Sequence, residues 1–408
     1  MALRVCIVGG GMITARQILP SLYHLRRAGQ VEAITVCARH SSRLRELARS
    51  DVLSAAFPGE TFRSFPPLET DPSETHEDAY RSAVDSLSPH NLVVVATPET
   101  THFEITRCAL LHDQHVLAVK PFVLSYRELD EIRRLADARG LWVGIEYHKR
   151  FDRRALEARG RCREGRFGVF RLGEAKLIEP WSYRHSNFQN WFTKESTDPF
   201  TYVGCHYVDL ACFITGLKPA EVSVRGVEGT FPNGNPAYLW TAARVVFDNG
   251  GVLSVINGLG YPDAGAGSND QGMTLFFEGA TAGAMLHHAD QYRGVQHCYL
   301  PEPSGGKSFH FVNPDFFRLV PWEGEGLRPV GYGYESIEAN VGAVRRVNDS
   351  PESGRREAIA GIEREGLIAT PSNTVGNTLV TEAGRLSLLN GGRNVRIRYE
   401  PEPGVELS

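Results

Sequence analysis

The first third of the chain alternates short apolar runs with segments in which apolar residues recur every three or four positions. The apolar runs are Leu3–Val8, Val31–Cys37, Leu92–Ala96, His115–Val119 and Leu141–Ile145. The helical segments between them are Ile13–Ala28, Glu104–Leu111 and Tyr126–Ala138. Solid apolar strands separated by helices predict a parallel sheet that is covered on both faces. Pro20 lies inside the first helical segment and predicts a kink or a short break there.

After Tyr147 the pattern changes to longer strand-like segments interrupted by glycine-rich turns such as Asp248–Gly251. The strand-like segments are Ala220–Val227, Leu239–Asn257 and Met273–His287. Turns of this kind join antiparallel neighbours. We therefore expect a second domain of the α+β class, with a large, mainly antiparallel open sheet.

A run of three glycines follows the first strand directly and opens the first helix. Gly9 permits the tight turn, and Gly11 lets the backbone approach a pyrophosphate at the helix N-terminus. Thr14 stands where a third glycine would complete the usual pattern. Placed at the start of a βαβ unit, this turn predicts an α/β Rossmann domain that binds NAD or NADP over residues 1–146. Residues 147–408 are then the second domain, which we expect to bind the substrate.

The end of the second strand bears on the choice between NAD and NADP. NAD-specific sites place a carboxylate there to hold the ribose 2′-hydroxyl. This chain has no carboxylate at that point and offers Arg39, Ser41 and Arg43 after Ala38. Arginine and serine side chains bind a 2′-phosphate, which favours NADP. Alternatively, Ser41 only caps the next helix and Arg39 stacks on adenine or points to solvent.

Several segments resemble landmarks of the glucose–fructose oxidoreductase, inositol dehydrogenase and rhizopine-catabolism (Gfo/Idh/MocA) family. Val93–His102 resembles its ATPxxxH segment, and His115–Pro121 resembles HVLxEKP with Val119 in place of the glutamate. Arg150-Phe151 and Gly165–Gly168 are similar to its RF and GxxG landmarks, and Gly204–Leu210 to its GxHxxDL helix. These segments follow one another in the family's order up to about residue 217. The resemblance implies an oxidoreductase of sugars or polyols.

The resemblance also implies that Lys120 and His206 are catalytic, and that Thr97, Pro98 and His102 line the nicotinamide pocket. The chain departs from the family at Tyr202, where an Asp commonly stands four residues before the helix histidine. Asp198-Pro199-Phe200 replaces the usual glycine run. Tyr202 therefore substitutes for the Asp, or the chemistry has changed. The predicted cofactor-binding residues are Gly9, Gly11, Met12, Ile13, Ala38, Arg39, Ser41, Arg43, Thr97, Pro98, His102 and Lys120.

The residue types support a site independently of the family. Lys120 lies just past the end of a buried strand, where open α/β sheets bind ligands, and an ammonium can hydrogen-bond a carbinol oxygen. Tyr202, His206 and Asp209 fall along one flank of a helix whose other flank is apolar, so His206 can act as a base. The alternatives are a surface lysine and a hydrogen-bonded core histidine beside a solvent-facing Asp209.

The stretch from Lys176 to Lys194 combines aromatic rings, amides and cations, which suit a polyhydroxylated ring, and Arg184 or Lys194 can hold an acidic sugar. Alternatively, its tryptophans belong to the core or to an interface. The predicted catalytic residues are Lys120, His206 and Tyr202. The predicted substrate-binding residues are Lys120, His148, Trp181, Tyr183, Arg184, His206 and Asp209.

The sequence thus predicts an NAD(P)-dependent oxidoreductase that interconverts a CH–OH group and a ketone on a sugar, sugar derivative or polyol. The alternatives are an NAD-dependent glycoside hydrolase, working by transient oxidation and elimination, and a non-catalytic nucleotide-dependent sensor. A net charge of −4 without a basic stripe argues against nucleic-acid and membrane partners. Seven scattered cysteines and the absence of a signal peptide indicate a cytoplasmic protein without a metal site. The resemblance implies a homodimer or homotetramer and makes residues 147–408 the oligomerisation domain as well as the substrate-binding domain.

Overall fold

The computed structural model describes residues 2–265, 267, 269–290 and 316–408. The chain divides into two compact units. The parallel-sheet unit takes the described residues of Met1–Val123, Arg127–Phe151 and Asp315–Thr374, and the large-sheet unit takes those of Leu124–Tyr126, Asp152–Pro314 and Val375–Ser408. No helix among the described residues is both long and apolar enough to cross a membrane.

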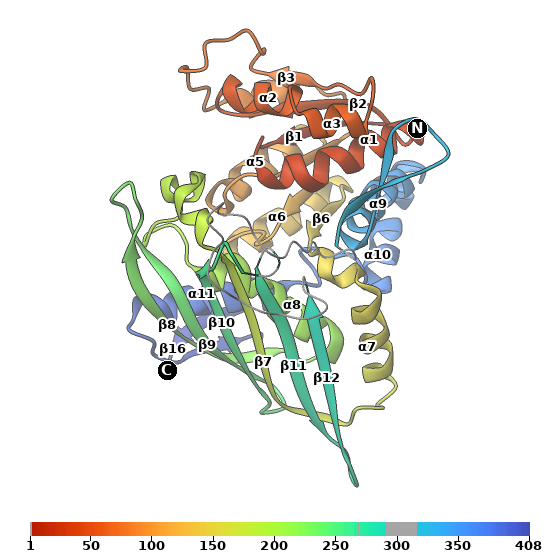
Figure 1. Cartoon of the computed structure of the whole chain (residues 1–408). Coiled ribbons are helices and arrows are strands. Elements are labelled where there is room, and N and C mark those ends of the chain that lie inside the picture. The colour runs from red at the N-terminus through yellow and green to blue at the C-terminus, as the bar shows by residue number, and fades with distance from the viewer. Residues whose placement is uncertain (1, 266, 268, 291–315) are drawn as a thin grey trace. The chain divides into compact units, whose positions relative to one another are not determined.

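The parallel-sheet unit is built on six parallel strands in the order β3-β2-β1-β4-β5-β6 (Figure 1). The strands are β1 (Leu3–Val8), β2 (Val31–Cys37), β3 (Arg63–Phe65), β4 (Leu92–Val95), β5 (His115–Val119) and β6 (Val143–Glu146). The predicted strands are confirmed, with β4 one residue shorter and β6 displaced toward Glu146. The three-residue β3 was missed because its polar residues make no apolar run.

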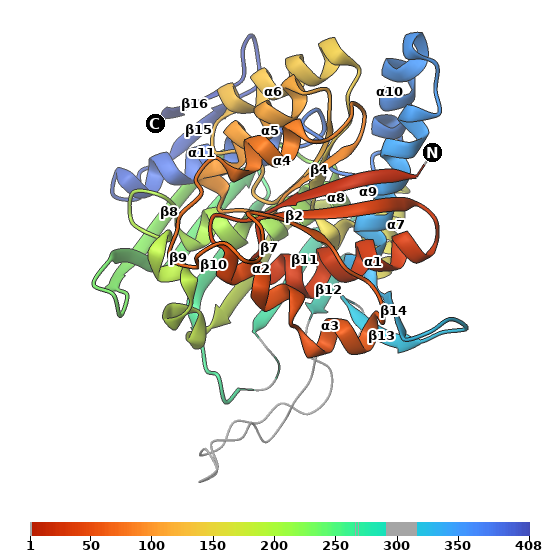
Figure 2. The ribbon, with the colours of Figure 1, turned by 90° about the horizontal axis from the view of Figure 1, so that it is seen from above.

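Helices cover both faces of this sheet, as predicted. Figure 2 shows α1, α2 and α3 on one side of the strands and α4, α5 and α6 on the other. The helices are α1 (Leu19–Arg27), α2 (Ser41–Ala48), α3 (Asp51–Ala56), α4 (Ala79–Asp85), α5 (His102–Leu111) and α6 (Tyr126–Arg139). Short helical turns are η1 (Thr14–Ile18), η2 (Glu99–Thr101) and η3 (His148–Phe151).

The helix does not break at Pro20, which instead lies two residues after a π-helical turn in a continuous run of helical residues. The segment η1 is a π-helical turn, and the regular helix α1 begins only at Leu19. Proline has no N–H, so Pro20 cannot donate to the carbonyl of Arg16 four residues earlier. The wider turn lies at the start of the helix that follows the glycine run.

A later segment of the chain completes the core of the parallel-sheet unit. Ile337, Val341 and Val344 of α9 share one apolar core with Ile18 and Leu22. The remaining elements of this unit are β13 (Arg318–Pro321), β14 (Leu327–Val330), α9 (Tyr332–Asn348), η7 (Glu352–Gly354) and α10 (Arg355–Glu365). In the structure these elements therefore belong to the same compact unit as the parallel sheet. The sequence pattern instead assigns all of residues 147–408 to the second domain. That functional division stays a prediction.

The large-sheet unit contains eight strands in the order β12-β11-β7-β10-β9-β8-β15-β16, antiparallel except for the pair β7 and β10. The strands are β7 (Val169–Pro180), β8 (Pro219–Thr230), β9 (Pro236–Phe247), β10 (Val252–Tyr261), β11 (Asp270–Glu278), β12 (Gly283–Asp290), β15 (Val395–Arg398) and β16 (Gly404–Leu407). The predicted fold class is confirmed. The strand β7 was missed because charged residues alternate with its apolar ones.

In Figure 1, α8 and α11 lie against one face of this sheet. The contacts of α8 with β7 and of α11 with β8 support this arrangement. The helical elements are α7 (Arg153–Arg163), η4 (Trp181–His185), η5 (Asn187–Asn190), η6 (Phe200–Gly204), α8 (Cys205–Thr215) and α11 (Val375–Leu389). The other face leaves large apolar side chains exposed. Leu172, Ile256 and Phe276 are 54%, 53% and 44% exposed.

The buried His115 makes the stability of the parallel-sheet unit depend on pH. Its Nδ1 accepts from the Trp142 N–H at 2.9 Å, so the neutral ring donates through Nε2 to the Asn348 side-chain oxygen at 2.9 Å. Burial lowers the pKa of His115 from 6.5 to about 4. As the pH falls from 6.5 to 4, the unfolded chain takes up the proton first, so folding loses up to about 3 kcal/mol.

We therefore expect His115→Gln to flatten the fall in unfolding free energy between neutral pH and pH 4, measured by denaturant titration. His112→Gln is the control, because the side chain of His112 is 41% exposed. An unchanged pH dependence in His115→Gln, relative to this control, would contradict the assignment.

Candidate cofactor and substrate sites

The turn after β1 fits a dinucleotide. Gly9 has a φ of +118°, and a Cβ there would lie 2.1 Å from the carbonyl oxygen of Ala96, so only glycine is possible. A Cβ on Gly11 would meet no atom within 4 Å, which leaves its backbone open to a ligand. The Thr14 hydroxyl, at the position of the usual third glycine, donates to the Gly9 carbonyl at 2.6 Å. Thr14 therefore secures the turn.

The strand order places this turn where ligands of open α/β sheets bind. The chain leaves β1 toward β2 on one side and leaves β4 toward β5 on the other, so the order reverses between β1 and β4. Gly9, Ala38 and Thr97 follow the carboxyl ends of β1, β2 and β4 closely. A Cβ on Gly10 would lie 3.5 Å from the Cβ atoms of Ala38 and Arg43. The structure thus brings these predicted cofactor residues together.

The residues predicted to hold a 2′-phosphate differ in exposure. Arg39 pairs with Glu77 and Arg43 with Glu46, and both arginine side chains are at least half exposed. Ser41 is buried, and its hydroxyl donates to the Thr70 carbonyl at 2.7 Å instead of capping α2. Arg39 and Arg43 can therefore reach a ligand from solvent.

His102 links the ends of β4 and β5. Its Nε2 lies 2.8 Å from the Thr97 carbonyl oxygen, and its Nδ1 lies 2.9 Å and 3.0 Å from those of Pro121 and Phe122. Burial lowers the pKa of His102, while the hydrogen bonds to these carbonyls act in the opposite direction. This link fixes the segment that carries the partly exposed Lys120 at the carboxyl edge of the sheet.

A carboxylate–imidazole pair that the sequence did not single out lies beside this segment. Glu146 ends β6 in register with Val119, and its side chain is 3% exposed. One carboxylate oxygen accepts from the Gln17 amide at 2.9 Å, and the other lies 2.7 Å from His148 Nδ1. Hence a carboxylate stands next to position 119, where the resembling family has its glutamate. The sequence signal that could have identified Glu146 is a glutamate at the end of an otherwise apolar strand.

The helix of His206 begins with a π-helical turn. Buried Asp198 accepts from the N–H and hydroxyl of Thr201 at 3.0 Å and 2.8 Å, and burial raises the pKa of Asp198. The wider turn η6 follows and includes Tyr202, so the spacing from Tyr202 to His206 is not that of a regular helix. Asp198-Pro199-Phe200 thus has a structural role in starting this turn.

The three residues predicted to form a row on this helix have different neighbours. The Tyr202 ring meets those of Phe188 and Trp191 edge-on, at 5.3 Å and 5.5 Å between centroids. His206 is 6% exposed. Asp209 is buried and accepts a hydrogen bond from the Asn377 side chain on α11.

The predicted substrate-binding stretch contains a core part and an accessible part. Tyr183 stacks on Phe188 at 5.0 Å, within an apolar cluster that Trp191 and Tyr202 also contact. Trp181 is 46% exposed, and the Arg184 guanidinium carbon lies 3.9 Å from the centroid of its ring. Part of the stretch is therefore core, as the alternative interpretation held, while Trp181 and Arg184 lie at its edge.

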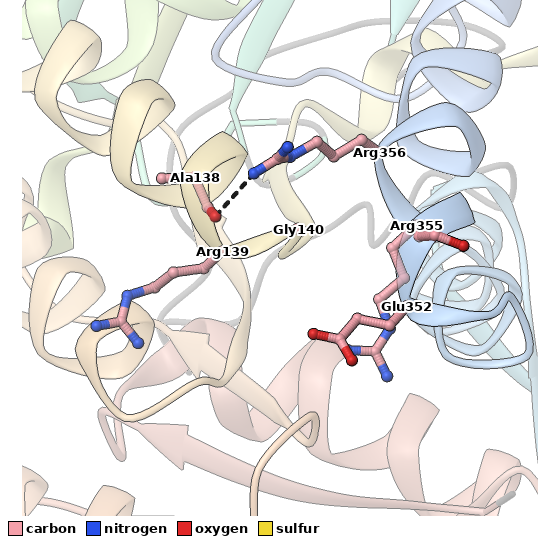
Figure 3. Close-up of a pocket in the computed structure, with 7 residues that line it drawn as sticks. Ala138, Arg139, Gly140, Glu352, Arg355 and Arg356 are labelled. Carbon is pink, nitrogen blue, oxygen red and sulfur yellow. Dashed lines mark hydrogen bonds between the residues drawn. The ribbon is translucent and has the colours of Figure 1, made fainter.

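A basic cavity of about 580 Å³ lies at the opposite edge of the parallel sheet, before β6 (Figure 3). Its arginines already have partners: Arg139 pairs with Asp113, Arg355 contacts His90, and Arg356 donates to the carbonyls of Asp137 and Ala138. It contains none of the predicted site residues, so it is not the candidate site.

Comparison with known families matches most of the chain. Residues 3–147 match an oxidoreductase family with an NAD-binding Rossmann fold, and residues 155–282 match the GFO/IDH/MocA C-terminal domain. UDP-N-acetylglucosamine 3-dehydrogenase of Acidithiobacillus ferrooxidans is 28% identical over 44% of this chain and 50% of its own length. D-glucoside 3-dehydrogenase of Escherichia coli is 25% identical over 62% and 68%. The chain thus aligns with only half the length of the first of these relatives.

Solved structures share the fold at low identity. Myo-inositol 2-dehydrogenase from Lactobacillus plantarum superposes with a TM-score of 0.61 and 16% identity, covering 98% of this chain and 100% of the other. GenD2 from gentamicin A biosynthesis, in complex with NAD, gives 0.64 and 18%, covering 97% of each chain. Both cover nearly the whole of this chain.

The contrast between two glycines tests the cofactor turn. Gly11→Ala should leave the melting temperature unchanged, because its Cβ meets no protein atom, yet weaken NAD(P) binding at least ~10-fold by blocking the pyrophosphate. Gly9→Ala should instead lower the melting temperature, because its Cβ overlaps the Ala96 carbonyl. Calorimetric titration and thermal melting measure the two effects. Wild-type nucleotide affinity in folded Gly11→Ala would argue against the site.

Proposed function

The chain belongs to the Gfo/Idh/MocA oxidoreductase family, and from this premise we propose that it interconverts a CH–OH group and a ketone on a sugar, sugar derivative or polyol. The observation that carries the proposal is the His102 link, which holds Lys120 at the same sheet edge as the glycine turn. Relatives named as dehydrogenases of UDP-N-acetylglucosamine, glucosides and inositol support the substrate class.

The proposed cofactor is NAD or NADP. The open approach to Gly11 fits a pyrophosphate, and the absence of a carboxylate after β2 favours NADP. Arg39 and Arg43 are the candidate ligands of the 2′-phosphate. A bound nicotinamide would accept hydride from the carbinol carbon or donate it to the ketone carbon.

Lys120 is proposed to position and polarise the substrate oxygen. An ammonium donates to a carbinol or carbonyl oxygen in either direction of the reaction. The Glu146–His148 pair, next to its strand, supports a polar environment for that oxygen, and His148 remains a substrate-binding candidate. His206 is proposed to take the hydroxyl proton and to return it in the reverse direction.

The role of Tyr202 is secondary in this proposal. Its ring belongs to the aromatic cluster, which supports a part in shaping the site. The contact between Asp209 and Asn377 supports a part for Asp209 in anchoring the helix of His206.

A homo-oligomer and a cytoplasmic location also remain proposals. Leu172, Phe276 and Met285 are neighbours in register across β7, β11 and β12, and each is at least 44% exposed. An exposed apolar row of this kind supports association through the open face of the large sheet.

Two substitutions test the catalytic residues. Lys120→Ala and His206→Ala should each lower kcat at least ~100-fold, because each removes a proton donor or acceptor at the substrate oxygen. The affinity for NAD(P), measured by calorimetry, should stay within about twofold of wild type. Lys176→Ala and His287→Ala are matched controls at exposed positions of the large sheet. Wild-type turnover in both site variants would show that the assignment is wrong.

Arg39 tests the preference for NADP. Arg39→Ala should weaken NADP binding about 10-fold and leave NAD binding nearly unchanged, because only NADP carries the 2′-phosphate. Arg133→Ala is the control, since Arg133 is an exposed, ion-paired arginine of α6. Equal losses for both nucleotides in Arg39→Ala would refute the 2′-phosphate contact.

A further inference from the structure

Two glycines on β10 make room for an indole ring in the large-sheet unit. Gly258 pairs with Trp240 across β9 and β10. A Cβ on Gly258 would lie 2.2 Å from one carbon of the Trp240 ring, and a Cβ on Gly260 would lie 2.2 Å from another. The indole therefore lies flat along β10, over backbone that carries no side chain at these positions.

The guanidinium of Arg184 lies at this surface. Its Nε donates to the carbonyl of Leu259, and an ideal Cβ on Gly260 would lie 3.2 Å from its Nη2. Its central carbon is 3.9 Å from the ring centroid of Trp181 and 5.9 Å from that of Trp240. Two indoles thus hold the cation, and the half-exposed Trp181 covers it.

Arg184 has no counter-ion among the described residues. No carboxylate of that part of the chain lies within the 4.0 Å of a salt bridge, and the buried Nη2 has no hydrogen-bond acceptor there. Loss of hydration lowers the pKa of Arg184. A cation that is partly removed from water without a partner costs stability, so it calls for an explanation.

The other cation of the same stretch differs in this respect. Lys194 is 2.7 Å from the carboxylate of Glu228 and lies over the ring of Tyr238. Its charge is already balanced within the protein. Of the two cations that the sequence offers for an acidic sugar, only Arg184 therefore lacks a carboxylate partner among the described residues.

Accordingly, we propose that Arg184, with Trp181 over it, binds a carboxylate or phosphate group of the substrate, which makes the substrate an anionic sugar. A guanidinium donates charge-assisted hydrogen bonds to either group, and the indole face offers a surface to a sugar ring. The inference rests on the proposed action on sugars and adds the charge of the substrate.

The surroundings of Arg184 connect this subsite to the proposed base. Trp240 and Tyr202 pack against the same apolar cluster, which is formed by Phe188, Phe192 and their neighbours. Tyr202 lies four residues before His206 and in the turn that begins its helix. A charge bound at Arg184 thus sits on the aromatic cluster from which the helix of His206 starts.

Pairs of sugars that differ in one anionic group test the inference. Calorimetric titration of the full chain should give tighter binding, by at least about 10-fold, for D-glucuronate than for D-glucose, or for N-acetylglucosamine 1-phosphate than for N-acetylglucosamine. A preference in the first pair identifies a sugar carboxylate as the anion. A preference in the second pair identifies a phosphate.

Variants assign the preference to Arg184. Arg184→Met should abolish it by weakening the anionic ligand at least about 10-fold, while the neutral partner changes less than about twofold. Arg184→Lys should retain part of it because the charge remains. Lys194→Met is the matched control and should keep the full preference.

Equal affinity of wild type for both members of both pairs would overturn the inference. So would a preference that survives in Arg184→Met or disappears in Lys194→Met. Turnover of neutral sugars without any charge preference would overturn this inference alone. A charge preference without any oxidation or reduction would instead overturn the proposed function and leave the anion subsite standing.

Discussion

Gly9 lies so close to the carbonyl of Ala96 that no side chain fits, and this approach joins the ends of β1 and β4. The Gly9 N–H donates to the Cys37 carbonyl at 2.8 Å, so the end of β2 is joined as well. The helix that follows begins next to Gly11, where an added Cβ would meet no protein atom within 4 Å. His102 extends the arrangement to β5 and so fixes the backbone of Lys120. These contacts together hold the glycine turn and the segment of Lys120 at one edge of the parallel sheet.

In the large-sheet unit, the proposed base His206 is positioned by contacts of the helix that carries it. The helix of His206 begins in a π-helical turn in which the Thr201 N–H donates to Asp198, and the contact of Asp209 with Asn377 ties the helix to α11. Aromatic rings pack around the start of this helix and extend to Trp240 and Arg184. The same cluster therefore supports the proposed base and the proposed anion subsite.

Much of the fold follows from local patterns in the sequence. Buried strands of a parallel sheet are mainly apolar, so β1, β2 and β5 have the predicted bounds, and the glycine run marks the turn. The strands β3 and β7 were not predicted, because β3 is very short and β7 presents charged residues to solvent.

Features of the site that depend on contacts between distant segments were harder to predict. Glu146 acquires its place through register with Val119, and Asp209 meets Asn377, which lies 168 residues later. The position of Arg184 depends on Gly258, Gly260 and Trp240, which all lie more than 50 residues later in the sequence. No local sequence pattern predicts it. Motif resemblance indicated Lys120 and His206, but it did not reveal these partners.

The most direct test of the central claim is the absorbance of reduced nicotinamide when NAD and NADP are each offered with sugars, inositols, sugar acids, nucleotide sugars and glycosides, followed by product analysis. The account predicts that reduced cofactor accumulates in proportion to a ketone formed from one sugar or polyol. Consumption of a glycoside without net reduction would contradict it and indicate the redox-neutral hydrolase. Absence of any reaction across the panel, with the nucleotide bound, would contradict the proposed activity altogether.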